Sequence, residues 1–468
     1  MVTEQNQVSR FFEGWRGKRL AVIGVGVSNS GVIRMLAQKG LDVTLCDRKS
    51  REQLGELAEE FAALGVKFRL GEEYLDRLTD FDIILRAPGV YFYRPELAEA
   101  RRAGCVVTSE LEVFFRLCPC PVYAVTGSDG KTTTTTLISE MLKAEGKTVH
   151  LGGNIGRALL PMVEQVRPQD RVVAELSSFQ LLSMRFAPQV SVVTNVSPNH
   201  LDVHGTMEEY IDAKKNIFLH QDAFSRTVLN LDNETAASFA PSIRGNLWNF
   251  SRQRRPAFGA YADEKGDIYV CGRGEGEPVF VMNQSEIRIP GLHNVENYLA
   301  AISAVWGEVS ADTIRKIARE FGGVEHRIEF VRELDGVKWY NDSIASSPSR
   351  TVAGLKAFRQ KIILLAGGYD KKIPFEPMVP YVLEKVKALI LMGLTAPKIE
   401  AAVRAGEGFD ENLLPIYHAE NLEDAVRIAR EISGPGDIVS LSPACASFDA
   451  FPNFEVRGRR FKELVEEL

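Results

Sequence analysis

The chain is 468 residues long, with 45% hydrophobic and 25% charged residues, which is the composition of an ordinary globular protein. Because one hydrophobic core rarely grows beyond ~250 residues, we expect about three domains. The net charge of −6 is spread without long runs of one sign. The lack of a polybasic stripe argues against nucleic acid as a partner.

The N-terminal sequence and the cysteines indicate the compartment in which we expect the protein. The first ten residues are polar and lack the apolar core of a signal peptide, and no apolar stretch approaches the ~20 residues needed to span a bilayer. The six cysteines form no C-x-x-C pair. Cys118 and Cys120 are separated by one proline, which predicts an extended linker rather than a zinc site. We expect a reduced, cytoplasmic protein without membrane insertion.

The first part of the chain has the pattern of half a dinucleotide-binding fold. An apolar strand at 19–23 runs into a turn with Gly24 and Gly26, and a second strand ends at Asp47, where a ribose contact could be made. The third glycine lies two residues too far along, so the fingerprint alone is weak. Another apolar strand at 81–86 completes the prediction of a parallel sheet.

The rest of the chain also alternates strands and helices. The central part is predicted to form a parallel sheet, extended by an antiparallel hairpin at 258–271. Its strands are expected at 122–126, 171–176, 190–196 and 227–232, and its last helices at 294–306 and 311–321. The final part is predicted to begin with a hairpin at 328–340 and to continue with strands at 361–366, 386–392 and 437–441.

The most informative segment is the loop T-G-S-D-G-K-T, which lies between an apolar strand and a helix. Gly127 and Gly130 allow backbone N–H groups to approach an anion, and Lys131 adds a positive charge. Thr132 or Thr133 can offer a hydroxyl to Mg²⁺. A tight turn with a solvated lysine is the alternative, but the order of strand, glycines, lysine and helix predicts a site for the phosphates of ATP.

Charged side chains after the neighbouring strands are candidates for binding a metal. Glu175 ends an apolar strand, where a lone carboxylate is costly without a cation, although a solvated strand end is the alternative. His200 follows the next strand at the same edge of the sheet. His204 imitates a helical zinc pair with His200, but no third ligand follows, so we expect a surface histidine. By its sequence context alone, Lys214 is an exposed helix lysine.

Taken together, these motifs resemble the Mur ligases, the ATP-dependent amino-acid ligases of peptidoglycan assembly, over essentially the whole chain. The phosphate loop departs from the eight-residue P-loop because Val125 stands where that pattern requires glycine, and this shorter loop is the family's version. The other matching positions are Asn154 in G-G-N-I-G, Glu175 in E-L-S-S-F-Q, His200 in N-V-S-P-N-H-L-D, Lys214 in Y-x-x-A-K, Asn294 and Asn297 in G-L-H-N-x-x-N, Arg327 in E-H-R and Asp342 in N-D-S.

The resemblance implies three α/β domains: a Rossmann-like uridine-nucleotide domain at 1–117, a P-loop ATPase-like domain at 118–323 and a Rossmann-like amino-acid domain at 324–468. The implied ATP-binding residues are Gly127, Ser128, Asp129, Gly130, Lys131, Thr132, Thr133, Asn294, Asn297, Arg327 and Asp342. The implied UDP-substrate residues are Val27, Ser28, Asp47, Arg48, Gly89 and Asn154. The implied catalytic residues are Lys131, Glu175, His200 and Lys214, and Thr132 joins the last three as a ligand of two Mg²⁺ ions. The resemblance further implies that Lys214 is carbamylated by CO₂, which turns a cation into an anionic oxygen ligand.

The C-terminal run L-S-P-A-C-A-S-F resembles the members of the family that add D-glutamate to UDP-N-acetylmuramoyl-L-alanine. By that resemblance Lys371, Ser447 and Phe454 surround D-glutamate, and the reaction passes through an acyl phosphate formed with ATP. We expect a monomer that acts on these small molecules. Two positions depart from the family. Ile344 stands where lysine is frequent and Ala87 where serine is common, so each removes a polar contact.

Three alternatives are compatible with parts of the sequence. A ligase of the same family could add another amino acid, such as L-alanine, L-glutamate or a diamino acid. A P-loop ATPase could couple hydrolysis to motion, although Val125 and the C-terminal motifs oppose it. A dehydrogenase could be built on the first block, with NAD in place of a uridine nucleotide.

Overall fold

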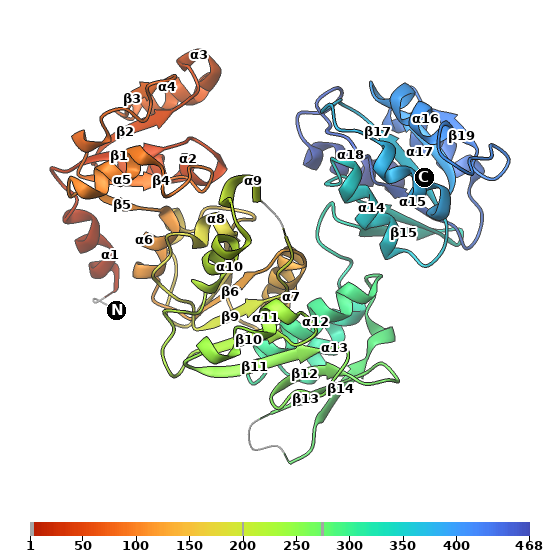
Figure 1. The fold of residues 1–468 in the computed structure, drawn as a ribbon, viewed down its shortest axis with the longest axis horizontal. Helices are drawn as coiled ribbons and strands as arrows, with labels where there is room; N and C mark the ends of the chain where they lie inside the picture. The colour runs from red at the N-terminus through yellow and green to blue at the C-terminus, as the bar shows by residue number, and fades with distance from the viewer. Residues whose placement is uncertain (1–3, 199–200, 273–275) are drawn as a thin grey trace. The chain divides into compact units, whose positions relative to one another are not determined.

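The computed structural model describes residues 4–198, 201–272 and 276–468, and its three β-sheets follow one another along the chain (Figure 1). The chain packs as two compact units, Met1–Gln284 with Glu296–Ile317, and Ser285–Val295 with Ala318–Leu468. The first two sheets belong to the first unit and the third sheet to the second. Within the described ranges, no helix is both long enough and apolar enough to cross a membrane.

The first sheet has the strand order β3-β2-β1-β4-β5, and all of its strand pairs are parallel. Its strands are β1 (Arg19–Ile23), β2 (Asp42–Asp47), β3 (Lys67–Leu70), β4 (Ile83–Arg86) and β5 (Val106–Thr108). The helices of this part are α1 (Glu4–Glu13), α2 (Val27–Gln38), α3 (Arg51–Leu54), α4 (Glu56–Ala63), α5 (Pro95–Arg102) and α6 (Glu110–Leu117). Alternate residues of β1 belong to different buried clusters, Leu20 and Val22 to one and Ala21 and Ile23 to the other. Both faces of the sheet are therefore covered, as the continuous apolar strands predict.

The central sheet has the order β14-β13-β12-β11-β10-β9-β6-β8-β7. Its strands are β6 (Val122–Thr126), β7 (Val149–Gly153), β8 (Arg171–Glu175), β9 (Val190–Val193), β10 (Arg226–Asn230), β11 (Asn246–Ser251), β12 (Gly259–Ala262), β13 (Asp267–Cys271) and β14 (Val279–Asn283). The helices are α7 (Lys131–Ala144), α8 (Ser178–Leu181), α9 (Leu201–His204), α10 (Met207–Lys215), α11 (Glu234–Ala237), α12 (Leu292–Val305) and α13 (Ala311–Glu320). The pairs β12–β13 and β13–β14 are antiparallel and the others parallel, so the predicted hairpin is confirmed.

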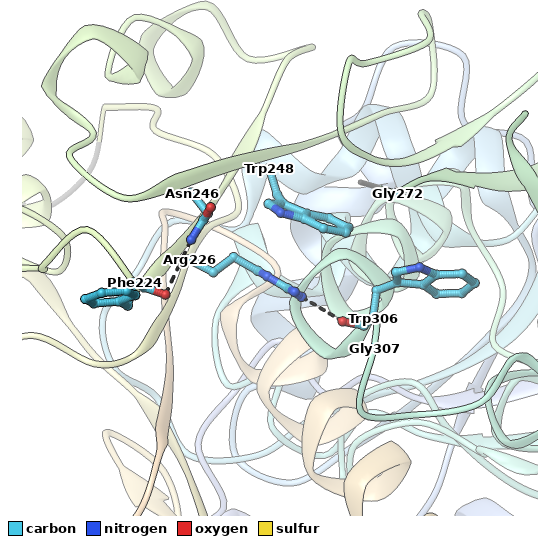
Figure 2. A pocket seen from close by; sticks show the side chains of 7 residues that line it. All are labelled: Phe224, Arg226, Asn246, Trp248, Gly272, Trp306 and Gly307. Carbon is cyan, nitrogen blue, oxygen red and sulfur yellow. Dashed lines mark hydrogen bonds between the residues drawn. The ribbon is translucent and has the colours of Figure 1, made fainter. Parts of the chain in front are cut away.

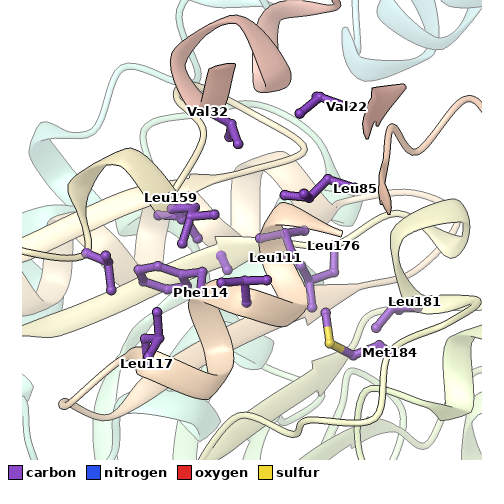
Figure 3. Close-up of a cluster of buried hydrophobic side chains, with 14 of the residues drawn as sticks. Val22, Val32, Leu85, Leu111, Phe114, Leu117, Leu159, Leu176, Leu181 and Met184 are labelled. Atoms are coloured by element: carbon purple, nitrogen blue, oxygen red, sulfur yellow. The ribbon is translucent and has the colours of Figure 1, made fainter. Parts of the chain in front are cut away.

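Helix α6 contributes apolar side chains at a helical spacing to one large buried cluster (Figure 3). Leu111, Phe114 and Leu117 of α6 belong to this cluster. It also contains Val22 and Leu85 of the first sheet, and residues that follow the central strands, such as Leu159, Leu176, Leu181 and Met184. Since burying one such side chain contributes about 1.5–3 kcal/mol, α6 stabilises this part of the chain mainly through its apolar face.

The third sheet has the order β15-β16-β20-β17-β18-β19. Its strands are β15 (Glu329–Leu334), β16 (Val337–Asn341), β17 (Ile362–Gly367), β18 (Val386–Met392), β19 (Ile416–His418) and β20 (Ile438–Leu441), and its helices are α14 (Pro348–Ala357), α15 (Val379–Lys385), α16 (Ala396–Arg404), α17 (Leu422–Ile432) and α18 (Phe454–Glu467). Only the predicted β15–β16 hairpin is antiparallel among the described pairs. Leu364 packs with α14, α15 and α16 on one face, whereas Ile363 packs with α17 and α18 on the other. The prediction of three α/β domains is confirmed.

Candidate active site

The phosphate loop lies between the end of β6 and the start of α7, as the sequence predicts. Two of its glycines adopt positive φ angles, +154° at Gly127 and +77° at Gly130. A Cβ atom on Gly127 would lie 1.9 Å from Thr194 Oγ1, and one on Gly130 would lie 2.3 Å from Asn297 Oδ1. These positions therefore require glycine for both backbone conformation and space. The N-terminus of α7 carries no side-chain cap, which leaves its N–H dipoles directed toward the loop, an arrangement that favours anions.

Two lysines converge on the same loop. Lys131 Nζ donates hydrogen bonds to the carbonyl oxygens of Gly127 and Ser128, at 3.0 and 2.9 Å. Lys214 Nζ donates to the Gly127 carbonyl at 2.7 Å, from helix α10. The loop therefore collects two amine groups, and the charge of Lys131 suits a ligand with negative charges.

Glu175, at the end of β8, is buried and held by two side chains. Thr132 Oγ1 donates to Glu175 Oε2 at 2.7 Å, and Asn154 Nδ2 donates to Oε1 at 2.8 Å. A hydroxyl beside a carboxylate is an oxygen donor set of the kind that Mg²⁺ prefers, so these residues fit the expected metal. Within the described ranges there is no cluster of three histidines, cysteines or acidic residues that could hold a metal ion. His200 lies outside the described residues.

The environment of Lys214 differs from what its local sequence suggests. Its side chain is 1% exposed, so the interpretation as an exposed helix lysine is wrong. Burial, and then the charge of Lys131, lower the pKa of Lys214 to about 7. The ammonium nitrogen also lies 4.6 Å from the centre of the Tyr210 ring. Because the pKa of Lys214 lies near 7, about half of the amine is neutral at pH 7, and the neutral form is a nucleophile.

His204 is buried as well, and the expectation of a surface histidine is wrong. Its ring nitrogens lie 2.9 Å from Ser178 Oγ and 3.3 Å from Glu209 Oε1. Its ring is stacked on Phe179 with centroids 5.1 Å apart. Both helices around it, α8 and α10, are short, so the sequence gives little periodicity from which this packing could be found. His204 therefore joins α8 to α10.

Asn297 and Asn294 both lie on α12. Asn297 Oδ1 accepts a hydrogen bond from Thr134 Oγ1 at 3.3 Å, which connects α12 to the helix of the phosphate loop. Asn294 Nδ2 donates to the Pro290 carbonyl at 2.6 Å. In the loop itself, Asp129 N donates to Asn195 Oδ1 at 2.9 Å, so the segment after β9 helps to fix the loop. Thr133 is buried at the start of α7.

The expected uridine-nucleotide residues surround the carboxyl ends of the first sheet. Asp47 accepts hydrogen bonds from the N–H groups of Val25 and Lys49, at 2.7 and 2.9 Å, so its carboxylate organises the glycine turn. Arg48 is exposed, and its Nε atom lies 3.8 Å from Glu72 Oε1. Gly89 is exposed in the loop after β4.

The remaining expected uridine-nucleotide residues are Val27, Ser28 and Asn154. Val27 and Ser28 begin α2. The Asn154 side chain donates to Glu175, at the end of β8 in the central sheet. Ala87, the residue that replaces the common serine, donates its N–H to the Ile23 carbonyl at 3.0 Å and lies beside Gly24.

Asp342 follows β16 in the second unit and is 4% exposed. Its oxygens accept hydrogen bonds from Ser442 Oγ at 2.7 Å and from Ile328 N at 3.3 Å. Burial nevertheless raises the pKa of Asp342 to about 7. Arg327 lies between His326 and Ile328, whose φ angles are +64° and +44°. Positive φ is unusual for histidine and costly for a β-branched residue, so the packing of this segment maintains a strained backbone.

The expected D-glutamate residues lie in the loops at the carboxyl ends of the third sheet. Lys371 Nζ lies 3.2 Å from the Ser346 carbonyl and 3.3 Å from its hydroxyl. Ser447 is buried. Phe454 begins α18, and its ring meets that of His326 edge-on at 5.9 Å.

A buried arginine, Arg457, supports these loops, and the sequence pattern did not indicate its role. Arg457 donates to the carbonyls of Ser343, Cys445 and Ala446, at 2.9, 3.1 and 3.2 Å. It thereby joins the N-D-S motif to the C-terminal run. Its spacing within α18 offered no signal, because a buried arginine cannot be distinguished from an exposed one without its partners.

Glu209 joins two segments of the chain whose contact the sequence pattern did not predict. The Tyr91 hydroxyl lies 2.9 Å from both carboxylate oxygens of Glu209. The loop that follows β4 is thereby joined to α10, the helix that carries Lys214.

Figure 2 shows a pocket of about 390 Å³ in the central domain. It is lined by Phe224, Arg226, Asn246, Trp248, Gly272, Trp306 and Gly307. Arg226 and Asn246 begin β10 and β11, whereas the phosphate loop follows the end of β6 in the same parallel sheet. The pocket therefore lies at the amino ends of β10 and β11, whereas the phosphate loop lies at the carboxyl end of β6. Arg226 Nη1 donates to the Trp306 carbonyl at 3.0 Å, so its guanidinium mainly caps the end of α12.

The fold and this site define an ATP-dependent ligase built from three α/β domains. The chain matches the descriptions "Mur ligase MurD-like, N-terminal domain" over residues 18–109, "Mur ligase middle domain" over 125–305 and "Mur ligase, glutamate ligase domain" over 326–445. It belongs to the Mur ligase family.

Proteins with assigned names are similar to this chain over nearly its full length. The chain is 52% identical over 458 residues to the UDP-N-acetylmuramoylalanine–D-glutamate ligase of Acetivibrio thermocellus, covering 97% of each chain. It is 49% identical to the protein of the same name from Clostridium perfringens, covering 98% of this chain and 99% of that one. The crystal structure of UDP-N-acetylmuramate–alanine ligase from Thermotoga maritima has a TM-score of 0.58 at 18% identity, covering 96% of this chain and 99% of that one. The last similarity supports the fold alone.

Proposed function

We propose that this protein joins D-glutamate to UDP-N-acetylmuramoyl-L-alanine, with ATP as the energy source, in the cytoplasmic synthesis of peptidoglycan precursors. The structural observation that carries the ATP-dependent part is the group of Lys131, Thr132 and Glu175 at the phosphate loop. The names of relatives about 50% identical over nearly the whole chain support the choice of substrates.

Each domain has a proposed role. Residues 1–117 bind the uridine diphosphate group through Val27, Ser28, Asp47, Arg48 and Gly89. Residues 118–323 bind ATP, and residues 324–468 bind D-glutamate through Lys371, Ser447 and Phe454. Asn154 supports Glu175, because its amide donates to that carboxylate. The active species is a monomer.

The proposed reaction has two steps. An oxygen of the L-alanyl carboxylate attacks the γ-phosphorus of ATP, the bond to the β,γ-bridging oxygen breaks, and ADP leaves with its electron pair. The amine nitrogen of D-glutamate then attacks the acyl carbon, and inorganic phosphate leaves as the nitrogen loses a proton. The protein supplies no nucleophile. It binds and orients the reactants and compensates the charge that shifts among the phosphate oxygens.

Lys131 and the loop N–H groups hold the phosphates in this proposal. The ammonium group now donates to carbonyls of its own loop, at 3.0 and 2.9 Å, and these bonds keep it close to the anion site. Asn297 supports the loop from α12, and Asn294, Arg327 and Asp342 complete the nucleotide contacts. Thr132, Glu175, His200 and the modified Lys214 hold two Mg²⁺ ions. When bound, these ions neutralise phosphate charge.

Carbamylation of Lys214 is the last part of the proposal. The neutral amine nitrogen attacks the carbon of CO₂ and loses a proton, which leaves an anionic carbamate. The lowered pKa of Lys214 favours the neutral amine that this step requires. The carbamate nitrogen retains one N–H, which can continue to donate to the Gly127 carbonyl.

The test is ADP release from purified protein with Mg²⁺, ATP, UDP-N-acetylmuramoyl-L-alanine and single amino acids. We expect release with D-glutamate, and little with L-glutamate, L-alanine or a diamino acid. Preference for one of the other amino acids would overturn the proposed specificity. Comparable release without acceptor and amino acid would instead favour a motor-type ATPase.

A further inference from the structure

A buried arginine holds the loop at residues 87–91, which follows β4 and is called the 87–91 loop below. Arg86 ends β4 and is 2% exposed. Its Nη1 atom donates to the carbonyl oxygens of Ala87, Pro88 and Val90, at 3.3, 3.3 and 2.7 Å. These residues flank Gly89, which is exposed. Because the C=O and N–H groups of a trans peptide point in opposite directions, the bond to the Pro88 carbonyl turns the N–H of Gly89 away from Arg86.

The same guanidinium group connects the 87–91 loop to the central domain. Nη2 of Arg86 donates to the Phe179 carbonyl at 3.1 Å and to Ser183 Oγ at 3.3 Å. Phe179 lies in α8, which begins shortly after Glu175. Ser183 in turn donates to Glu112 Oε2 at 3.3 Å, so its hydroxyl bridges the arginine to a buried carboxylate. Burial lowers the pKa of Arg86 to about 10, and the charge of Glu112 opposes this shift. The guanidinium therefore stays charged at pH 7, and its contacts with the loop are charge-assisted.

A second contact joins the far end of the 87–91 loop to α10. The Tyr91 hydroxyl lies 2.9 Å from both oxygens of Glu209, and burial together with this contact raises the pKa of Tyr91 to about 12. The hydroxyl is therefore the donor. Glu209 Oε1 also lies 3.3 Å from His204 Nδ1, and Nε2 of the same ring lies 2.9 Å from Ser178 Oγ of α8. The loop is thus joined to both α8 and α10, and α10 carries Lys214.

We propose that Arg86 and Tyr91 are positioning residues, which hold the 87–91 loop at a fixed separation from the phosphate loop. One end of the acyl acceptor can then bind at Gly89 while its carboxylate reaches the site of Glu175. A loop that is ordered before binding loses less conformational entropy when the ligand binds. Neither side chain needs to touch the substrate. This inference rests on the proposed function, because only a substrate that contacts both domains requires this separation.

The first test compares Arg86→Lys with Arg102→Lys, which changes an exposed arginine at the end of α5 in the same domain. Lysine keeps the charge, but its single nitrogen cannot reproduce the contacts of a planar guanidinium with both the loop and α8. We expect the KM for UDP-N-acetylmuramoyl-L-alanine to rise by about 10- to 100-fold in Arg86→Lys. The KM values for ATP and D-glutamate should stay close to those of the wild type. Arg102→Lys should match the wild type in all three.

Tyr91→Phe tests the second contact with a smaller change, because it removes only the hydroxyl. We expect the KM for the UDP-linked acceptor to rise by about 5- to 20-fold. Glu209→Gln keeps an oxygen that accepts from the hydroxyl and should remain near the wild type, whereas Glu209→Ala should match Tyr91→Phe. Combining Tyr91→Phe with Glu209→Ala should add little, since both changes remove the same contact. Tyr93→Phe is the control, because that ring is 50% exposed and lies just after the loop.

Calorimetric binding of UDP-N-acetylmuramoyl-L-alanine, without ATP or D-glutamate, separates this inference from the proposed function. We expect the wild type to bind, and Arg86→Lys and Tyr91→Phe to bind more weakly by the factors seen in KM. Absence of binding by the wild type would overturn the proposed function and this inference with it. Binding by the wild type with unchanged affinity in Tyr91→Phe, or an equal rise of all three KM values, would overturn the positioning role alone. Tyr91→Phe decides the outcome where Arg86→Lys does not fold.

Discussion

Thr132 Oγ1 and Glu175 Oε2 are joined by a hydrogen bond of 2.7 Å across the carboxyl ends of β6 and β8. The second carboxylate oxygen is held by Asn154 at 2.8 Å. A buried carboxylate of this kind is stable only when its charge is compensated. The geometry thus places a carboxylate beside the phosphate loop, and Thr132 and Glu175 would hold a metal ion there.

Replacing Glu175 with glutamine keeps the shape and removes the charge. We expect kcat to fall by about 100-fold or more, because a neutral amide would bind the metal more weakly than the carboxylate does. The Mg²⁺ concentration needed for half-maximal rate is expected to rise. Glu140→Gln, on α7, removes only a surface pair with Lys143 and serves as the control. Wild-type kinetics and Mg²⁺ dependence for Glu175→Gln would show that this carboxylate does not serve the metal.

Gly127 is expected to tolerate no side chain. A Cβ atom would meet Thr194 Oγ1 at 1.9 Å, and the φ angle of +154° is unfavourable for other residues. Gly127→Ala should therefore reduce nucleotide affinity by more than about tenfold and lower the midpoint of thermal unfolding. The matched control is Gly146→Ala after the same helix, where φ is +83° but no atom lies within 4 Å of the added Cβ. This control should lose about 1 kcal/mol of stability and keep activity. Equal effects of the two substitutions would contradict the steric explanation.

Asp342→Asn is expected to change the pH dependence of stability. The pKa of Asp342 is raised from its ordinary 3.8 to about 7 in the folded protein. Between these pH values the folded state holds a proton that the unfolded state releases, so the contribution of Asp342 is fully present below about pH 3.8 and is lost as pH rises to about 7. The free energy of unfolding of Asp342→Asn, relative to the wild type, should therefore rise over this window by on the order of 1–3 kcal/mol.

Thermal unfolding without ligands at pH 5 and pH 8 measures this effect. Asp335→Asn is the control, since Asp335 lies in the turn of the β15–β16 hairpin and its side chain is 66% exposed. A difference between Asp342→Asn and the wild type that is the same at both pH values would refute the buried-acid explanation. Activity of Asp342→Asn is expected to be lost, because the proposed contact of Asp342 with the nucleotide is altered.

The parts of the fold that depend on local pattern could be predicted from the sequence. Continuous apolar strands and the short phosphate loop indicated parallel sheets and the position of Lys131, because both signals are contained in a few adjacent residues. Glu175 was predicted as a candidate for the same reason, because it ends one of these apolar strands. The family resemblance, and not the residue pattern, supplied a role for Lys214.

The surroundings of individual polar side chains could not be predicted in this way. His204 and Lys214 were expected at the surface, but His204 is buried against Phe179 and Lys214 against the phosphate loop. Their partners are 25 and 87 positions away along the chain. Contacts between residues so far apart in the chain cannot be predicted from a local sequence pattern. Arg457 was missed because its burial depends on carbonyls of two distant loops.

Lys214 provides the last prediction, which concerns dependence on CO₂. Only the neutral amine reacts with CO₂, and its fraction rises as pH increases through about 7, the pKa of Lys214. At a fixed concentration of dissolved CO₂, the carbamylated fraction and the rate should therefore increase from pH 6 to pH 8. Lys214→Met should lower kcat by about 100-fold or more and abolish this dependence. Lys215→Met is the matched control, because the neighbouring lysine points to a surface pair with Asp212.

The modification can be observed directly by ¹³C NMR after addition of ¹³C-bicarbonate. A carbamate signal is expected for the wild type and for Lys215→Met, and none for Lys214→Met. Short carboxylic acids added to Lys214→Ala should restore part of the activity, because they supply an anionic oxygen ligand in the vacated space. A fully active wild-type protein that shows no carbamate signal and no response to bicarbonate would refute the modification, while leaving the phosphate site of Lys131 and Glu175 in place.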